Sequence, residues 1–217
     1  MDFSTLCIHG SDRKYDNTGA ISVPIFQSAT FAHPGVGLST GYDYSRLQNP
    51  TREHLEMTVA KLEGGVDAMA FSSGMAAIAA LMELFSPGDH IIASDDLYGG
   101  SHRLFYNISE KNGLRFSLVN TSDISQIEAH IRPETKAIFI ETPTNPMMHV
   151  TDIAAAARLA KSYNLLLIVD NTFLTPYYLK PLALGADIVI HSGTKFLGGH
   201  NDTLAGFLVV ADSGLSE

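Results

Sequence analysis

The sequence predicts an α/β fold with a mostly parallel, seven-stranded sheet that is covered by helices on both faces. Short apolar runs alternate with stretches of helical periodicity, and the runs are apolar at successive positions rather than at every second one. A chain of 217 residues with 45% hydrophobic residues can bury one sizeable core of this kind. Right-handed crossovers place the loops that follow the strands along one edge of such a sheet, where ligands bind.

The first 52 residues (1–52) are expected to be irregular, because they are rich in Gly, Ser, Pro and Tyr and carry little helical periodicity. A segment of this length without its own core is expected to wrap another molecule or to line a site. Residues 53–217 are expected to form one large domain. Its first helix is expected at 53–63, where Gly64 and Gly65 end it.

The elements after residue 65 are expected to alternate between strand and helix. Strands are expected at 68–71, 90–93, 115–119, 137–140, 165–169, 187–190 and 203–210. Helices are expected between them at 75–85, 101–112, 124–131 and 153–163. The longest apolar run, 75–85, contains Glu83 and is far too short to span a bilayer, so no membrane partner is expected.

Charge and cysteine content argue against several classes of protein. The net charge is −9 and no Lys/Arg cluster is present, so no nucleic-acid partner is expected. Cys7 is the one cysteine and the N-terminus lacks a signal peptide, which favours a cytoplasmic protein without an intrachain disulfide. No pair of histidines has zinc-site spacing, so no metal is expected. The absence of a G-x-G-x-x-G sequence argues against a nicotinamide-binding domain.

Polar side chains follow five of the expected strands, directly after each strand ends. These loops contain small polar groups, an aromatic ring, a carboxylate and a lysine, and they lie at 72–75, 94–100, 141–146, 170–172 and 191–195. Because the carboxyl ends of parallel strands meet at one edge of a sheet, we expect these groups to form a single site.

Ser73, Gly74 and Met75 lie where an expected strand leads into an expected helix. Free main-chain N–H groups and the positive end of the helix dipole favour a phosphate there, and Gly74 permits its close approach. The same residues also fit an ordinary serine N-cap with no ligand.

Asp170 ends the strongly apolar run LLLIVD, so its carboxylate is expected to be partly desolvated and to need a cationic partner. A protonated pyridine nitrogen would serve, and the pairing would keep the ring a strong electron sink. The alternative is a carboxylate that caps a helix or braces a loop. Tyr98, in DDLYGG, could lie against a planar cofactor or could be a surface residue of a turn.

Lys195 follows an expected strand in the sequence HSGTKFLGGH. Ser192 and Thr194 can hold phosphate oxygens beside it, and the neighbouring glycines leave room for a ligand. A lysine in a partly buried, electropositive pocket is expected to have a lowered pKa, which suits bond formation with an aldehyde. A lysine chosen at random, by contrast, is solvated.

These residues belong to fragments that together resemble one family. HSGTKFLGGHND, preceded by ADIVI and followed by TLAG, is similar to the lysine signature of the Cys/Met-metabolism enzymes that use pyridoxal 5'-phosphate (PLP). This family includes cystathionine γ-synthase, the cystathionine lyases, methionine γ-lyase and the O-acetylhomoserine sulfhydrylases. The resemblance covers nearly the whole chain in family order, through YDYSRLQNPTREHLE, FSSGMAA, DDLYGGSHRLF, ETPTNP and VDNTFLTP.

The resemblance implies the aspartate-aminotransferase-like fold (fold type I) and PLP as cofactor. It implies that Lys195 binds the cofactor covalently and shuttles protons, that Asp170 pairs with the ring nitrogen and that Tyr98 stacks on the ring and takes part in catalysis. It assigns the phosphate to Gly74, Met75, Ser192 and Thr194, beside Ser73. Asn145 is expected near the ring hydroxyl and the substrate carboxylate. Tyr44 and Arg46 resemble the pair that reaches into a neighbouring subunit's site and grips its phosphate, and Tyr44 is also expected to bind the substrate there. The resemblance further implies a homotetramer built from two dimers.

Two departures from the family pattern are visible. Phe196 stands where family members usually have tyrosine after the lysine, which is a mild change. The chain also ends at Glu217, where relatives continue into a smaller C-terminal domain that contains the arginine for the substrate carboxylate. A fragment without that domain is therefore expected to be inactive by itself, even if PLP binds.

The resemblance favours γ-replacement on an O-acylhomoserine by cysteine or another thiol, as in cystathionine γ-synthase. YGGSHRLF and PLALGADIVIHS are more similar to the γ-synthase and O-acetylhomoserine group than to the bacterial β-lyases, and Gly100 stands where methionine γ-lyases have a reactive cysteine. Arg103 is expected to recognise the distal anion of the substrate. The alternatives are a cystathionine β- or γ-lyase and, in another class, a non-catalytic assembly module.

Overall fold

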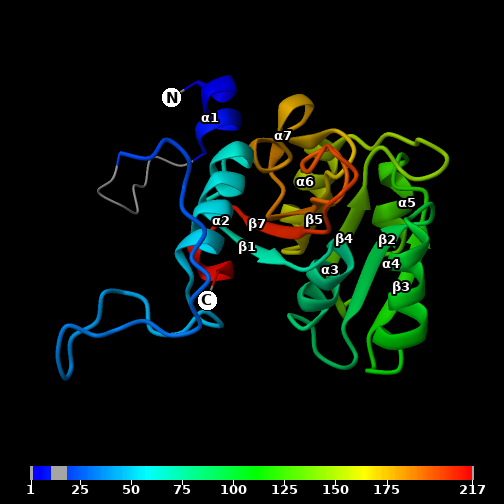
Figure 1. Ribbon diagram of the computed structural model, residues 1–217. Helices are drawn as coiled ribbons and strands as arrows, with labels where there is room; N and C mark the ends of the chain where they lie inside the picture. Colours follow the sequence, from blue (N-terminus) through cyan, green and yellow to red (C-terminus); the bar gives the residue numbers. More distant parts are fainter. Residues whose placement is uncertain (1, 11–18, 217) are drawn as a thin grey trace.

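A seven-stranded sheet forms the centre of the computed structural model, which describes residues 2–10 and 19–216 (Figure 1). Its strands are β1 (Asp67–Phe71), β2 (His90–Ser94), β3 (Arg115–Val119), β4 (Thr135–Glu141), β5 (Leu166–Asp170), β6 (Ile188–Ser192) and β7 (Gly206–Val210). Their order across the sheet is β1-β7-β6-β5-β4-β2-β3. Six of these strands run in the same direction, and β7, which lies between β1 and β6, runs in the opposite direction. The mostly parallel sheet predicted from the sequence is confirmed.

Helices cover both faces of the sheet, as the sequence predicts. On one face, α3 (Gly74–Met82) and α4 (Gly99–Leu104) pack with the buried ring of Phe105 against alternate strand residues such as Ile168. The other face is covered by α2 (Pro50–Glu63), α5 (Ile124–Ala129) and α6 (Ile153–Ser162), which pack over residues such as Leu167. Successive residues of one strand are therefore buried on opposite faces, which explains the continuous apolar runs.

The boundaries of the helices differ from the predicted ones where local capping decides them. α2 begins at Pro50 rather than at residue 53, because the Asn49 side chain accepts the N–H of Thr51 (2.9 Å) and proline suits the first turn. Gly64 ends this helix in the left-handed conformation (φ 81°). The predicted helix 101–112 is α4 followed by a π-helical turn at Phe105–Ser109.

The N-terminal segment is not wholly irregular, which corrects the sequence prediction. It contains α1 (Phe3–His9), whose first turn is capped by the Asp2 carboxylate. Residues 11–18 lie outside the described residues, and residues 19–49 extend away from the sheet in blue in Figure 1. Arg52 of α2 donates to the main-chain oxygens of Ser45 and Leu47, which fixes the end of this segment to the domain.

Short helical turns complete the domain: α7 (Thr175–Tyr178) and the 3-10 turns at Leu182–Leu184 and Ser213–Leu215. Within the described ranges, no helix combines the length and the apolar character that crossing a bilayer requires.

Candidate active site

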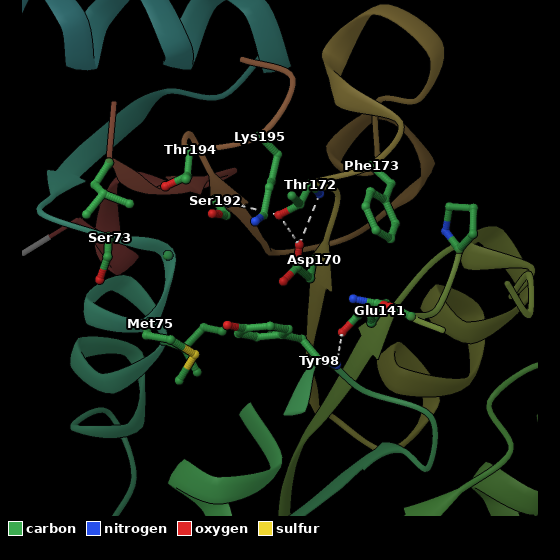
Figure 2. Close-up of a pocket in the computed structure, with 15 residues that line it drawn as sticks. Ser73, Met75, Tyr98, Glu141, Asp170, Thr172, Phe173, Ser192, Thr194 and Lys195 are labelled. Atoms are coloured by element: carbon green, nitrogen blue, oxygen red, sulfur yellow. Dashed lines mark hydrogen bonds between the residues drawn. The ribbon is translucent and has the colours of Figure 1, made fainter. Parts of the chain in front are cut away.

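A pocket of about 190 Å³ opens at the edge of the sheet where the parallel strands end (Figure 2). Most of the residues predicted for the site line it, and they come from five separate loops. These residues are Ser73, Gly74, Met75, Tyr98, Asn145, Asp170, Ser192, Thr194 and Lys195. The convergence expected from the order of strands and loops is therefore present in the fold.

Asp170 occupies the last position of β5 and is partly buried. Its Oδ1 atom accepts hydrogen bonds from the main-chain N–H (3.0 Å) and the hydroxyl (2.6 Å) of Thr172. The Thr172 hydroxyl oxygen in turn accepts the N–H of Ser192 (2.9 Å), which joins the ends of β5 and β6. Burial raises the pKa of Asp170. In the described part of the chain no salt bridge reaches this carboxyl group, so a cationic ligand would find an unpaired carboxylate there.

The start of α3 is packed so closely that glycine is required. A Cβ atom on Gly74 would lie 2.8 Å from the Cβ of Ser192, and one on Gly206 would lie 2.0 Å from the main-chain oxygen of Ser73. The Ser73 hydroxyl caps the helix by accepting the N–H of Ala76 (3.1 Å), so the alternative reading of this motif as an N-cap is also correct. The helix N-terminus opens into the pocket beside Ser192, which is a favourable place for a phosphate.

Lys195 lies on the loop that follows β6. Figure 2 shows its side chain directed into the pocket, with the amine on the side of Asp170 and Thr172. The lysine is exposed rather than partly buried, which corrects the sequence prediction, because it forms part of the wall of a pocket that is open to solvent. Its position nevertheless brings a nucleophilic amine and a buried carboxylate into one cavity.

The ring of Tyr98 lies across the pocket from Lys195, next to Met75 (Figure 2). A Cβ atom on Gly100 would lie 2.4 Å from Cε1 of Tyr98 and 2.9 Å from the sulfur of Met75. Gly100 therefore leaves space for the ring, and any larger residue at this position would displace it.

Glu141 is a member of the site that the sequence reasoning did not select. It ends β4, it is 6% exposed, and its Oε2 atom accepts the main-chain N–H of Tyr98 (2.8 Å). Desolvation, reinforced by the nearby Asp170, raises the pKa of Glu141 to about 8. A signal was present, because IFIE ends a buried strand in the same way that LIVD does at Asp170.

Three predicted residues lie outside the pocket. Arg103 is exposed on α4. Tyr44 and Arg46 lie in the extended segment, where the Arg46 guanidinium carbon stacks 4.9 Å from the centre of the Tyr44 ring. These positions leave the predicted contact of Tyr44 and Arg46 with a second subunit as a prediction.

A buried polar cluster braces the strand ends from the opposite face. The Oε1 atom of Glu63, at the end of α2, accepts hydrogen bonds from Nε2 of His191 (2.5 Å) and Nδ2 of Asn171 (2.9 Å). All three side chains are buried. Asn171 directly follows Asp170, and His191 directly precedes Ser192. The cluster was missed because Glu63 is more than a hundred residues from both Asn171 and His191 in the chain.

The groups in the pocket fit PLP. The partly buried Asp170 can pair with a protonated ring nitrogen, and Tyr98 offers a flat ring for stacking. The glycine-lined start of α3 suits a phosphate, and Lys195 can bond an aldehyde carbon.

Comparisons with known proteins place the chain in a family. A sequence model of the Cys/Met metabolism PLP-dependent enzymes matches residues 4–217. The chain is 52% identical over 217 residues to a cystathionine gamma-lyase of Bacillus subtilis, covering all of this chain and 57% of that protein. It is 55% identical over 206 residues to a cystathionine gamma-synthase of Haemophilus influenzae, covering 94% of this chain and 56% of that protein.

A solved structure has the same fold. The crystal structure of cystathionine gamma-lyase from Lactobacillus plantarum, complexed with L-serine, superposes with a TM-score of 0.96 at 49% sequence identity. The match covers 100% of this chain and 56% of that structure. The chain thus spans about half the length of the relatives it matches. The chain belongs to the Cys/Met metabolism family of PLP-dependent enzymes.

Proposed function

We propose that the protein catalyses γ-replacement on an O-acylhomoserine, in which the Cγ–O bond breaks, a carboxylic acid leaves and a thiol such as cysteine forms the new Cγ–S bond. The observation that carries the PLP chemistry is the convergence of Lys195, Asp170 and Tyr98 on one pocket. When bound, PLP supplies an electron sink for the carbon atom beside the substrate's amino group.

Lys195 and Asp170 have complementary roles in this proposal. The Lys195 amine would hold the cofactor through its aldehyde carbon and would serve as the base that moves protons at the substrate carbon atoms. The Asp170 carboxylate, oriented by its two hydrogen bonds from Thr172, would pair with the protonated ring nitrogen. Both side chains line the same cavity, which supports the proposal that they act on one bound cofactor.

The remaining pocket residues hold the cofactor. Tyr98 stacks on the ring and takes part in catalysis beside it, and its N–H bond to Glu141 fixes the loop that carries it. The N–H groups at Gly74 and Met75, with the side chains of Ser192 and Thr194, hold the phosphate next to Ser73.

Substrate recognition involves groups at the mouth of the pocket and outside it. Asn145 lines the pocket and is assigned to the ring hydroxyl and the substrate carboxylate. Arg103 is assigned to the distal anion of the substrate. Tyr44 and Arg46 are assigned to the site of a second copy of the chain, because they lie in the extended segment away from their own pocket.

The assembly in this proposal is a homotetramer in which residues 1–52 wrap a second copy and residues 53–217 form the PLP-binding domain. The extended segment supports this assignment because it exposes large apolar side chains, which a partner would cover. These are Ile21, Ile25, Val36, Leu38 and Leu47.

A cystathionine lyase is the second candidate. The observation that favours it is that relatives named gamma-lyase, gamma-synthase and beta-lyase match the chain at similar identity, 52%, 55% and 49%. The protein at its natural length, incubated with O-acetylhomoserine and cysteine and separately with cystathionine alone, distinguishes the two. Cystathionine made in the first mixture supports γ-replacement. A keto acid, ammonia and a thiol from the second mixture alone would assign the lyase instead.

The PLP assignment has its own test on the purified chain. We expect a visible absorbance band after reconstitution with PLP, and borohydride treatment followed by peptide mass mapping is expected to place the cofactor on Lys195. A chain that remains colourless, with no modified lysine, would instead support a non-catalytic assembly module.

A further inference from the structure

Two carboxyl groups lie side by side at the inner end of the pocket. Glu141 ends β4 and Asp170 ends β5, and the parallel register of these strands pairs the two residues. Both line the pocket, where Glu141 is buried and Asp170 is partly buried. Two like charges on adjacent, partly desolvated side chains destabilise each other, so one of the pair is favoured in its neutral form. A neutral Glu141 therefore favours the ionised form of Asp170, which is the form that can pair with a cationic ring.

The groups around Glu141 favour its neutral form. Asp170 on β5 and Asp96 in the loop after β2 are carboxyl groups that oppose a second negative charge. The main-chain N–H groups of Tyr98 and Asn145 act in the opposite direction but are outweighed by desolvation, and together these effects raise the pKa to about 8. Lys195 lines the same pocket and is the cation assigned to the cofactor instead.

A neutral carboxylic acid can still accept the hydrogen bond that Glu141 receives from the main chain of Tyr98. Its carbonyl oxygen accepts the Tyr98 N–H (2.8 Å), and its O–H remains as a donor. This hydrogen bond spans from the end of β4 to the loop after β2, which carries the Tyr98 ring over the pocket. Loss of the acceptor would leave a main-chain N–H without its partner and release the loop.

We propose that Glu141 is a positioning residue, which remains protonated at neutral pH, holds the main chain of Tyr98 and leaves the negative charge at the inner end of the pocket to Asp170. The proposal rests on the cofactor roles proposed above for Tyr98 and Asp170, and it adds the residue that keeps both in their working state.

The charge of Glu141 is tested on the chain without PLP, by urea unfolding of the wild type and of Glu141→Gln across pH. A carboxyl group whose folded pKa is raised stabilises the fold fully below its unfolded pKa and loses that contribution as pH rises to the folded value. We therefore expect the unfolding constant of the wild type, relative to E141Q, to rise at least about tenfold between about pH 5 and about pH 8.5. The exposed Glu110 provides the control, since E110Q is expected to parallel the wild type. Parallel curves for E141Q and the wild type would overturn the proposal.

The positioning role is tested by titrating PLP into wild type, E141Q and Glu141→Ala, with lysine-bound absorbance as the readout. Glutamine keeps both neutrality and a carbonyl acceptor, so its dissociation constant is expected within about threefold of the wild-type value. Alanine removes the acceptor, and its dissociation constant is expected to rise at least about tenfold. Equal affinity of E141A and the wild type would overturn the positioning role.

The two arms keep this proposal distinct from the proposed function. Failure of the wild type to take up PLP would overturn the cofactor roles and the positioning role together, while the unfolding arm still reports whether Glu141 is protonated. If E141Q does not fold, an infrared pH titration of the wild type labelled with ¹³C-glutamate reports the protonated glutamate band with Asp170 still in place. Persistence of that band to about pH 8 supports the proposal, and its loss near the ordinary glutamate pKa overturns it.

Discussion

The buried Glu63–His191 pair allows a stability prediction whose size follows from the structure. Replacing His191 by leucine removes the donor 2.5 Å from Oε1 of Glu63 and leaves that carboxylate, 1% exposed, with Asn171 as its remaining hydrogen-bond donor in the described chain. Removing one partner of a buried hydrogen bond costs about 1–3 kcal/mol, and more when the group left behind is charged. We therefore expect H191L to lower the free energy of unfolding by about 2 kcal/mol or more, which is a change of about 30-fold or more in the unfolding equilibrium.

The assay is urea unfolding at neutral pH, followed by circular dichroism, on four proteins that form a double-mutant cycle: wild type, H191L, Glu63→Leu and the double variant. In E63L the buried imidazole of His191 loses its hydrogen-bond partner, which is expected to cost about 1–3 kcal/mol. The double variant removes both polar partners, and apolar replacement of a buried pair is often close to neutral. The double variant is therefore expected to be more stable than the sum of the single changes implies, by at least about 2 kcal/mol. Additive effects, or a loss below about 1 kcal/mol in H191L, would refute the view that these residues form a coupled pair.

Three further outcomes follow from the site and the core. Gly74→Ala places a Cβ atom 2.8 Å from the Cβ of Ser192, so PLP affinity measured by absorbance titration is expected to fall at least about tenfold. Asp170→Ala removes the partner of the ring nitrogen, and we expect weaker PLP binding with Lys195 still modified after borohydride, as mass mapping would show. His90 is buried with its pKa lowered to about 4, so the unfolded chain binds a proton that the folded chain does not. Stability is therefore complete above about pH 6.5 and falls as pH drops towards 4, and urea unfolding of His90→Leu is expected to show a smaller dependence on pH over this range.

The sequence predicts most of the fold because its strands are buried on both faces. The predicted strand at 115–119 coincides with β3, and the other predicted strands overlap the observed ones within a few residues. The predicted helix ends were less accurate, because they depend on capping residues such as Asn49. A cap is a single residue, so it adds little to the hydrophobic periodicity from which the helices were predicted. The helix α1 was missed because a single amphipathic turn or two gives little signal.

The site could be predicted where its residues directly follow strands, and it could not be predicted where tertiary packing selects them. Asp170 and Lys195 stand at strand ends with polar loops after them, so chain order alone brings them to one edge. Glu141 has the same signature, but its role depends on a hydrogen bond to Tyr98, 43 residues earlier in the chain. Glu63 resembles any glutamate at a helix end, and its burial is decided by the docking of α2 against His191.

The antiparallel strand β7 ties the start of α3, where we propose that a phosphate binds, to the rest of the sheet. Gly206, its first residue, is paired in register with Phe71 of β1 on one side and with Ser192 of β6 on the other. Because β7 runs opposite to its neighbours, its beginning lies at the edge where theirs end, and its glycine permits the contact with the main chain at Ser73. The start of α3 and the loop that carries Lys195 are therefore held together by β7, which comes after the other six strands in the chain. A phosphate bound there, as proposed, would contact residues of both flanking segments, so its binding energy would stabilise the complete sheet rather than any single loop.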